Sequence, residues 1–556
     1  MLSRQLSYDP GVDVTRAPGV HERALRGDFR DVEGALLALR RDASRDARGW
    51  CAALEALYAL VRPERADARP STADAAARAD ASSHEAARLS TGDDATAAAH
   101  AASHSALACV LRADLPGLEA WARAARAIPG ATGARVAAIT EAWRALLTGD
   151  APDAEPVERA AARAGDAAHV VEAAAIRALA AMDRPELDEA VAIARRAARM
   201  ARTEQLLIHE YLANLVLARA RRATGRAYLA ARIASALAQV APEPWRPWLA
   251  WELTLAGHDH AAAPPGGSAA AWLGTALEHA LGGDRPAFAS AVTELRERTR
   301  GFAAFDAEAA ALVTMLDPHA AVTGTSHAAA WCRGEAHAPP FGVRDQGSAT
   351  HPAALIVWQP GAVPRRVLRS GIALAGLGAG AWTPGDDGPT KDGRTHAALA
   401  VLALAGPSGI EDRALFRAVY GFELVPVKHD GVFRVLLHRL RAVLAGAAAI
   451  DREDTRLVLR PTRPLACPDP RTLLPLEERI LGLLAAGHGR VTARQIADEL
   501  RIALRSVQSA LGDLVETGAC TMEREGRRVE YAVEDTTFYE PSLHRLAAPT
   551  ADRRVR

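Results

Sequence analysis

The stretch Lys428–Leu444, KHDGVFRVLLHRLRAVL, indicates most about how this chain folds near its C-terminus. Its apolar side chains recur three and four residues apart, which is typical of a helix that buries one face in a core. That apolar stripe consists of Phe433, Leu436, Leu437, Leu440 and Leu444. We therefore expect the charged residues of the stretch to lie on the outer side of the helix.

The basic side chains of this stretch gather on another face and in the first turn. Arg434, His438 and Arg441 are four and three residues apart, so they share one face. Lys428 and His429 lie in the first turn. A helix fits the major groove of DNA, where arginine can bridge O6 and N7 of guanine or hold a phosphate. The stretch predicts a DNA-reading helix; a solvated charged face on a structural helix is the alternative.

The order of the elements expected around this helix indicates the fold of the domain that contains it. In chain order they are strands at Ala354–Trp358, Arg366–Leu368 and Ile372–Leu377, helices at Arg394–Ala405 and Glu411–Tyr420, and, after Leu444, a β-hairpin in AAIDREDTRLVLRP. This order, over about Ala354–Pro464, resembles the winged-helix domain of OmpR/PhoB-type and SARP-type regulators. The most specific similarities are Arg439, Leu440 and Arg441 and the segment LFRAVYGF. The resemblance implies DNA binding.

The hairpin would form the wing of such a unit, and it carries both signs of charge. Arg456, with Arg452 and Arg460 near it, could contact phosphates. Acidic side chains in the same hairpin weigh against DNA binding, and they are Asp451, Glu453 and Asp454.

A second winged-helix unit is predicted over 472–541. Thr492 and Gln495 form a capping box at a helix start, and a tight hairpin around Gly526 follows the next helix. The candidate DNA-contacting residues are Arg505, Ser506, Gln508 and Ser509 on that helix and Arg527 and Arg528 in the hairpin. About sixty residues resemble MarR/ArsR/DeoR-like winged helices. Glutamine can read adenine, but such units also dock proteins, so both roles stay open.

The first half of the chain is predicted to be helical. Alanine, the best helix former, makes up close to a quarter of the 556 residues, and short breaks separate helices as antiparallel pairs require. The pair Glu204–Val240 resembles a tetratricopeptide (TPR) repeat through Leu217, Ala218, Ala230 and Pro242. The predicted fold class is mainly α, with an N-terminal α-solenoid of TPR-like helix pairs followed by two winged-helix (α+β) domains. A compact helical domain is the alternative for the first half.

Shifts in composition suggest the domain boundaries. The predicted segments are an N-terminal tail (1–18), the TPR-like domain (19–317), a Gly-, Ser-, His- and Pro-containing linker (318–353), the two winged-helix units (354–464 and 472–541) and a basic tail (542–556). Because the linker is polar, we expect Ala354–Arg556 to fold without the helical half.

Composition and cysteine usage exclude several classes of protein. The net formal charge is zero, with +4 over 361–556, so charge alone does not indicate nucleic-acid binding. The sequence has no apolar stretch long enough to span a membrane and no apolar leader. The five cysteines form no CxxC pair, so neither a disulfide framework nor a zinc ribbon is expected. We expect a reduced, cytoplasmic protein with no membrane partner.

The sequence lacks two common catalytic motifs and contains part of a metal-binding pattern. The sequence has no GxSxG and no Walker A motif. His100 and His104 share a helix face at a spacing that can hold Zn²⁺, and Asp93 lies seven residues before His100. Cys109 falls off that face and no HExxH glutamate accompanies the pair. The sequence therefore predicts no catalytic residues, no cofactor and no metal site.

Together these patterns predict a sequence-specific transcriptional regulator that is not an enzyme. The expected partners are double-stranded DNA on the winged helices and, on the helical repeats, a protein or peptide or a second copy of the chain. The first winged helix is expected to supply most of the affinity, and the second to refine the site or dock a partner. The alternative is a non-enzymatic scaffold whose winged helices bind protein.

Overall fold

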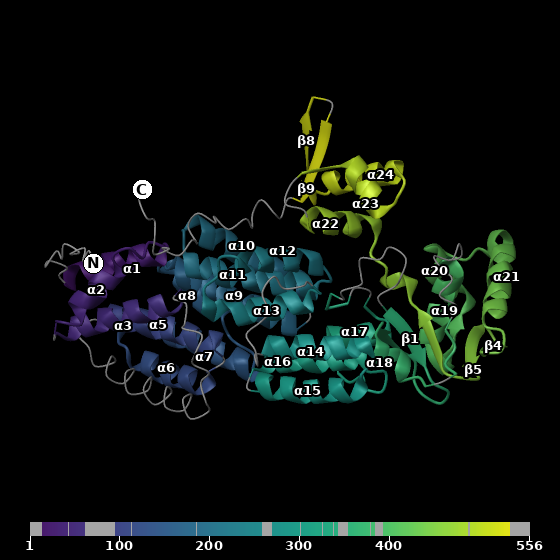
Figure 1. The fold of residues 1–556 in the computed structure, drawn as a ribbon, viewed down its shortest axis with the longest axis horizontal. Helices are drawn as coiled ribbons and strands as arrows, with labels where there is room; N and C mark the ends of the chain where they lie inside the picture. The colour runs from purple at the N-terminus through teal and green to yellow at the C-terminus, as the bar shows by residue number, and fades with distance from the viewer. Residues whose placement is uncertain are drawn as a thin grey trace, which may run out of the picture.

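The computed structural model describes residues 14–42, 44–61, 95–112, 114–184, 186–257, 269–300, 302–324, 326–336, 339–342, 354–378, 380–383, 393–486, 490–526 and 528–533. The chain is mainly helical, as predicted, and small antiparallel sheets lie in its C-terminal region. The molecule is elongated, with the N-terminal helices at one end and the helices and strands of 393–461 at the other (Figure 1). Over the described ranges, no helix is long and apolar enough to cross a membrane.

Successive helices pack side by side through the first 333 residues (Figure 1). They are η1 (Val14–Arg16), α1 (Ala17–Leu25), α2 (Val32–Leu39), α3 (Arg45–Ala59), α5 (Ala95–Leu111), α6 (Leu115–Ala127), α7 (Gly130–Thr148), α8 (Glu155–Arg163), α9 (Ala167–Asp183), α10 (Leu187–Thr203), α11 (Leu207–Ala223), α12 (Ala227–Ala238), η2 (Glu243–Trp245), α13 (Arg246–Leu255), α14 (Ala269–Gly282), α15 (Arg285–Thr299), α16 (Ala303–Leu316) and α17 (His327–Arg333).

Several of these helices begin at an acidic side chain. Asp114, Asp166 and Asp284 each accept a hydrogen bond from the backbone N–H three residues further on, which satisfies a donor that the first helical turn leaves unpaired. Helix α7 ends at Gly149, whose φ is 83°, a left-handed conformation that glycine adopts easily. Local sequence therefore sets many of the helix ends.

Buried alanines explain how closely the helices pack. Ala175 of α9, Ala194 of α10 and Ala218 of α11 have no exposed surface, and these three helices contact one another. Larger side chains such as Trp143 and Trp245 fill the wider spaces between helices. The indole N–H of Trp245 donates to the carbonyl of Leu60, 185 residues earlier in the chain, at 3.0 Å.

A buried network of charges joins α11, α13 and α16. The Arg222 guanidinium donates to Glu252 at 2.7 Å and to Glu308 at 2.5 Å. Arg219 also binds both carboxylates, and the indole N–H of Trp251 donates to Glu308 at 2.8 Å. Because each buried charge has opposite charges beside it, the network fixes the three helices relative to one another.

A three-stranded sheet follows the helical half, and one predicted strand is a helix instead. The sheet has the order β2-β1-β6, all antiparallel, with β1 (Ala354–Trp358), β2 (Arg365–Leu368) and β6 (Leu465–Pro468). The expectation of a strand at Ile372–Leu377 was wrong, because Gly371–Ala375 forms the short helix α18. The hydroxyl of Ser370 accepts from the N–H of Ala373 and so favours a helix start at this point.

The stretch expected to be a linker, 318–353, contains helix α17 and buried apolar side chains. Trp331 has no exposed surface, and Phe341 is 3% exposed. Both belong to a core cluster that also contains Leu273 of α14 and Leu368 of β2. This core therefore spans the boundary that the sequence placed before Ala354.

Two further units lie within the described residues 393–461 and 476–533. The first contains α19 (Gly393–Ala405), η3 (Gly406–Ser408), β3 (Ile410–Glu411), α20 (Asp412–Tyr420), α21 (Pro426–Val443), β4 (Ala448–Glu453) and β5 (Arg456–Pro461), with sheet order β3-β5-β4. After η4 (Pro470–Thr472), the second contains α22 (Leu476–Ala486), β7 (Val491–Thr492), α23 (Ala493–Leu500), α24 (Leu504–Glu516), β8 (Cys520–Glu525) and β9 (Arg528–Val533), with sheet order β7-β9-β8. Each unit is built around an apolar cluster that also takes in neighbouring elements: the first includes Ile356 of β1 and Leu465 of β6, and the second includes Leu229 of α12.

Candidate nucleic-acid interface

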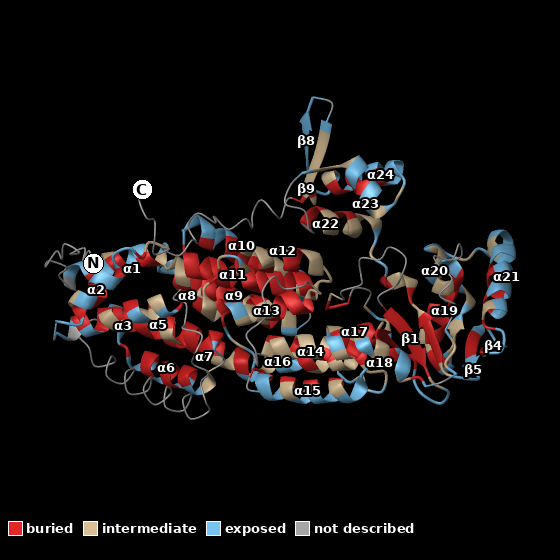
Figure 2. Cartoon of the chain, viewed as in Figure 1, coloured by how far each residue is buried: buried red, intermediate tan, exposed pale blue. Residues whose placement is uncertain are grey.

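Helix α21 presents one face to the core of its unit and the other to solvent. The predicted apolar stripe is buried: Phe433, Leu436, Leu437, Leu440 and Leu444 are each at most 6% exposed. They pack against α19 and α20 and against the β4–β5 hairpin. The opposite face of α21 lies at the outer edge of the molecule, and Figure 2 shows it as exposed.

Four of the predicted DNA-contacting residues lie on the exposed side of α21. Lys428, Arg434, His438 and Arg441 are all exposed. The guanidinium of Arg434 forms an ion pair with Asp430, one turn earlier, at 2.7 Å. No ion pair joins Lys428 or Arg441 to another residue in the described ranges. The two unpaired cations are therefore the ones most available to an anion.

His429 is placed differently from the other predicted residues. Its ring stacks on Phe416 with a centroid separation of 5.2 Å, and its Nδ1 accepts a hydrogen bond from the N–H of Val425 at 3.0 Å. The ring therefore joins the start of α21 to α20, and the structure does not group it with Arg434, His438 and Arg441.

Exposed valines accompany the cations on α21, and the sequence analysis missed them. Val427 is 98% exposed and Val435 is 51% exposed. Val435 lies one residue after Arg434, away from the buried stripe, so the helical spacing alone could have identified it. Small apolar groups of this kind can contact the methyl group of thymine.

The β4–β5 hairpin contributes little unpaired positive charge. The carboxylate of Asp412 accepts from Arg452 at 2.7 Å, and Arg460 pairs with both Asp451 and Glu453. The predicted residue Arg456 is exposed, and its guanidinium donates to the Ser408 carbonyl at 3.0 Å. Acidic neighbours thus neutralise most of the cations that the sequence analysis assigned to the wing.

Helix α24 carries the polar candidates of the second unit. Arg505, Ser506, Gln508 and Ser509 are all exposed, and Val507 is fully buried between them. The preceding helix α23 starts with the predicted capping box of Thr492 and Gln495. Spacing along the helix thus separates the polar side chains from the core, as expected.

Charged side chains in the hairpin of the second unit also form ion pairs. Arg528 forms an ion pair with Glu530 at 2.7 Å, and Arg490 pairs with Glu523. Gly526 has a φ of 61° at the turn. The predicted residue Arg527 lies outside the described residues.

The second unit rests on the helical half through α12 and α22. The hydroxyl of Tyr228 donates to Glu478 at 2.6 Å, and Leu229 belongs to the same core cluster as Ile480 and Leu481. Arg232 donates to the Ala485 carbonyl at 2.5 Å. The second unit therefore lies above α12, away from α21 (Figure 1), and the two sets of predicted residues form two separate surfaces.

Comparison with known proteins gives no relative from which to transfer a role. No protein-family model, no curated protein and no solved structure matches the chain.

Proposed function

We propose that the chain is a DNA-binding transcriptional regulator without catalytic activity of its own, working in the cytoplasm. The unit 393–461 is interpreted as a winged helix in which α21 is the recognition helix, and 476–533 as a second winged helix led by α24. The observation that carries the proposal is the outer face of α21, where unpaired Lys428 and Arg441 flank exposed valines. A helix with this face fits a major groove: the cations hold phosphate or guanine, and the valines contact thymine.

The helical half is interpreted as an α-solenoid of TPR-like pairs that receives a protein or peptide or a second copy of the chain. In support, three of the four positions that match the TPR pattern, Leu217, Ala218 and Ala230, have no exposed surface at the α11–α12 contact, and the fourth, Pro242, is half-buried. Arrays of this kind offer an extended surface to a partner.

The test is DNA binding by the full chain at several salt concentrations, on a duplex selected from a random pool. Changing Lys428, Arg434 and Arg441 together to alanine should abolish specific binding and flatten the slope of log affinity against log salt by up to about three phosphate equivalents. A matched control removes the same charge elsewhere, by changing exposed Arg163, Arg296 and Arg298 to alanine, and should leave the slope unchanged. Equal losses in both variants would contradict a specific role for α21.

A scaffold that binds protein through the same units is the second candidate. It is favoured by the neutralised hairpin, in which Arg452 and Arg460 already have carboxylate partners, and by the exposed side chains of Val427 and Val435. If no duplex from the pool binds the folded chain at low salt, the scaffold becomes the better account.

A further inference from the structure

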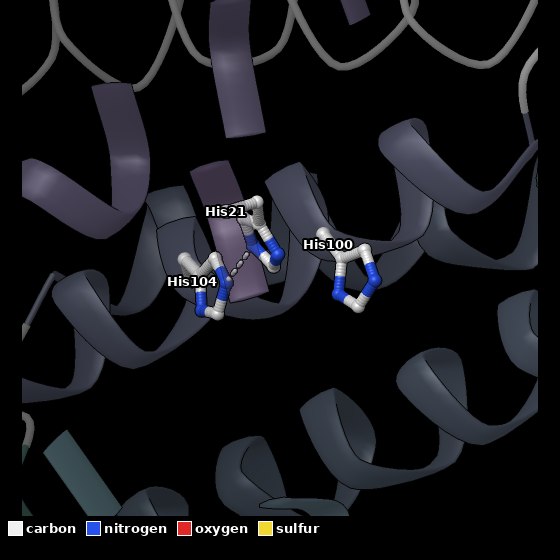
Figure 3. Close-up of side chains that lie close together, drawn as sticks. All are labelled: His21, His100 and His104. Atoms are coloured by element: carbon white, nitrogen blue, oxygen red, sulfur yellow. Dashed lines mark hydrogen bonds between the residues drawn. The ribbon is translucent and has the colours of Figure 1, made fainter. Parts of the chain in front are cut away.

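Three histidines from two distant parts of the chain meet inside the helical half. His100 and His104 lie one turn apart on α5, and His21 comes from α1 (Figure 3). The Nε2 atoms of His21 and His104 are 3.0 Å apart. One ligand atom from each of the three rings can be chosen so that all three atoms lie within 4.8 Å of one another. The sequence analysis identified the α5 pair but not His21, which is 83 residues before His104.

The surrounding helices hold these rings close together. The ring centroids of His21 and His100 are 4.4 Å apart, and the indole of Trp50 from α3 lies 5.7 Å from His21 and 6.1 Å from His100. His21 and His104 are buried, whereas His100 is half-buried. The cluster is therefore walled by α1, α3 and α5, and it is most open on the side of His100.

Burial keeps two of the three rings, those of His21 and His104, in the neutral form. Burial, together with the neighbouring His100, lowers the pKa of His21 to about 3. Burial and the other histidines also hold the pKa of His104 well below its usual value. A neutral imidazole has a free lone pair on one nitrogen, which is what a metal ion requires.

We propose that His21, His100 and His104 together bind one divalent transition-metal ion, for which Zn²⁺ is the best-suited candidate. Imidazole nitrogens suit Zn²⁺, and three protein ligands with a fourth position left to water form a recurring zinc arrangement. This binding site goes beyond the proposed DNA-binding function and would tie α1 to α5.

The distance between the Nε2 atoms of His21 and His104 is close to the nitrogen–nitrogen distance in a tetrahedral zinc site. At tetrahedral Zn–N distances of about 2.0–2.1 Å, neighbouring ligand nitrogens lie roughly 3.3 Å apart. The two Nε2 atoms at 3.0 Å need only a small outward shift, while the ring of His100 turns inward. The ring that donates in this contact shifts its proton from Nε2 to its own Nδ1, which leaves the Nε2 lone pairs of both His21 and His104 for the metal.

The test measures Zn²⁺ binding by the full chain after the chain has been treated with a chelator and dialysed. We expect one tightly bound Zn²⁺ per chain, and we expect His100→Gln to weaken its affinity at least about 10-fold, because removing a ligand should cost no less than removing a second-shell partner. His279→Gln is the matched control, since His279 is also half-buried on a helix, and it should leave the affinity unchanged. This control is needed because the chain has 18 histidines.

Co²⁺ in place of Zn²⁺ provides a second measurement that does not depend on affinity. Bound Co²⁺ should give the intense visible absorption of a tetrahedral site, and His21→Gln should weaken or shift that absorption while the far-ultraviolet circular dichroism stays helical. Absence of tight Zn²⁺ binding to the unmodified chain would overturn the proposal. Equal binding by the His100→Gln and His279→Gln variants would also overturn it, and would leave the cluster as packing between α1, α3 and α5.

Discussion

Arg366 and Asp469 form a fully buried ion pair that joins three segments of the chain. Neither side chain has any exposed surface, and the guanidinium donates twice to the carboxylate, at 3.0 Å and 2.7 Å. Arg366 also donates to the carbonyls of Trp331 and Ala336 at 3.1 Å and 2.6 Å. The pair thus joins β2, the residues after β6 and the end of α17 at a single buried point.

Asp469→Ala should lower the free energy of unfolding by about 3–5 kcal/mol, because it leaves the buried charge of Arg366 without its partner. Chemical denaturation of the full chain measures this change. Glu297→Ala removes the exposed partner of Arg300 and should cost no more than about 1 kcal/mol. If the two variants have the same free energy of unfolding, the buried pair contributes no more to stability than the exposed pair does.

The same carboxylate should make stability depend on pH. Burial alone would raise the pKa of Asp469, but hydrogen bonds and charges from Arg471 and Arg366 outweigh burial and hold that pKa below its usual value. The ionised form therefore stabilises the fold fully above the pKa of the unfolded chain, about 3.9, and this contribution is lost as the pH falls through the lowered pKa of the folded chain.

Denaturation curves recorded between neutral pH and pH 3 check this prediction. The unmodified chain should lose stability more steeply below about pH 4 than the Asp469→Ala variant does. Parallel curves for the two proteins would show that other carboxylates account for the acid sensitivity.

At the scale of single elements, helix α21 shows which structural features can be predicted from the spacing of residues in the sequence. Its buried stripe follows directly from the three- and four-residue recurrence of apolar side chains, and every predicted member is buried. The pairing of Arg434 with Asp430 also has helical i,i+4 spacing, so the sequence contains the signal for it. The stacking of His429 on Phe416 joins two helices and depends on how they pack, which spacing within one helix does not show.

The pairing of Arg434 leads to a prediction about DNA binding. Asp430→Asn should strengthen binding and steepen the salt slope by about one phosphate equivalent, because it frees a cation and removes an anion from the proposed contact face. Arg441→Ala should weaken specific binding by about 1–3 kcal/mol. Titrations of the selected duplex at several salt concentrations measure both changes, and weaker binding by Asp430→Asn would mean that Asp430 itself contacts a base.

Helix α18 shows why a local sequence pattern can predict the wrong type of element. The segment Ile372–Leu377 alternates small and apolar residues, which also suits a strand, and the capping hydroxyl of Ser370 lies just outside it. Gly371 lies directly against Gly283, where an added Cβ would come within 2.5 Å of the Gly283 backbone nitrogen. Contact with α14 therefore favours the helix, and that contact joins residues too far apart in sequence for a local pattern to show.

For the molecule as a whole, composition predicted the helical class, whereas the core around Trp331 crosses the boundary that composition suggested before Ala354. A stretch rich in Gly, Ser, His and Pro suggested a linker at 318–353, yet Trp331 within it is fully buried. The core around Trp331 reaches from α14 to β2. A fragment beginning at Ala354 would expose that apolar surface to water, which removes the basis for expecting the fragment to fold by itself.

The contact between α12 and α22 should decide where the second unit lies. Tyr228→Ala removes both the hydrogen bond to Glu478 and the ring that lies against Gly482, so the contact should weaken and the second unit should leave the helical half in a larger fraction of the molecules. X-ray scattering should then show a larger radius of gyration, and protease should cut near Leu473 more quickly. Tyr58→Ala, which removes a hydroxyl bonded to Glu33 far from this contact, should change neither measurement.

The long separation between Arg366 and Asp469 has a consequence for the newly made protein. These partners are 103 residues apart in the chain. A ribosome that adds about 5–20 residues per second would therefore expose Arg366 roughly 5–20 s before Asp469 emerges. Throughout that interval the sheet β2-β1-β6 is incomplete and the buried guanidinium of Arg366 lacks its carboxylate partner, so a nascent chain in this state would be a natural client for a chaperone. A chain that ends before Asp469 would keep Arg366 without its partner permanently and would be removed by proteases rather than accumulate as a shortened protein.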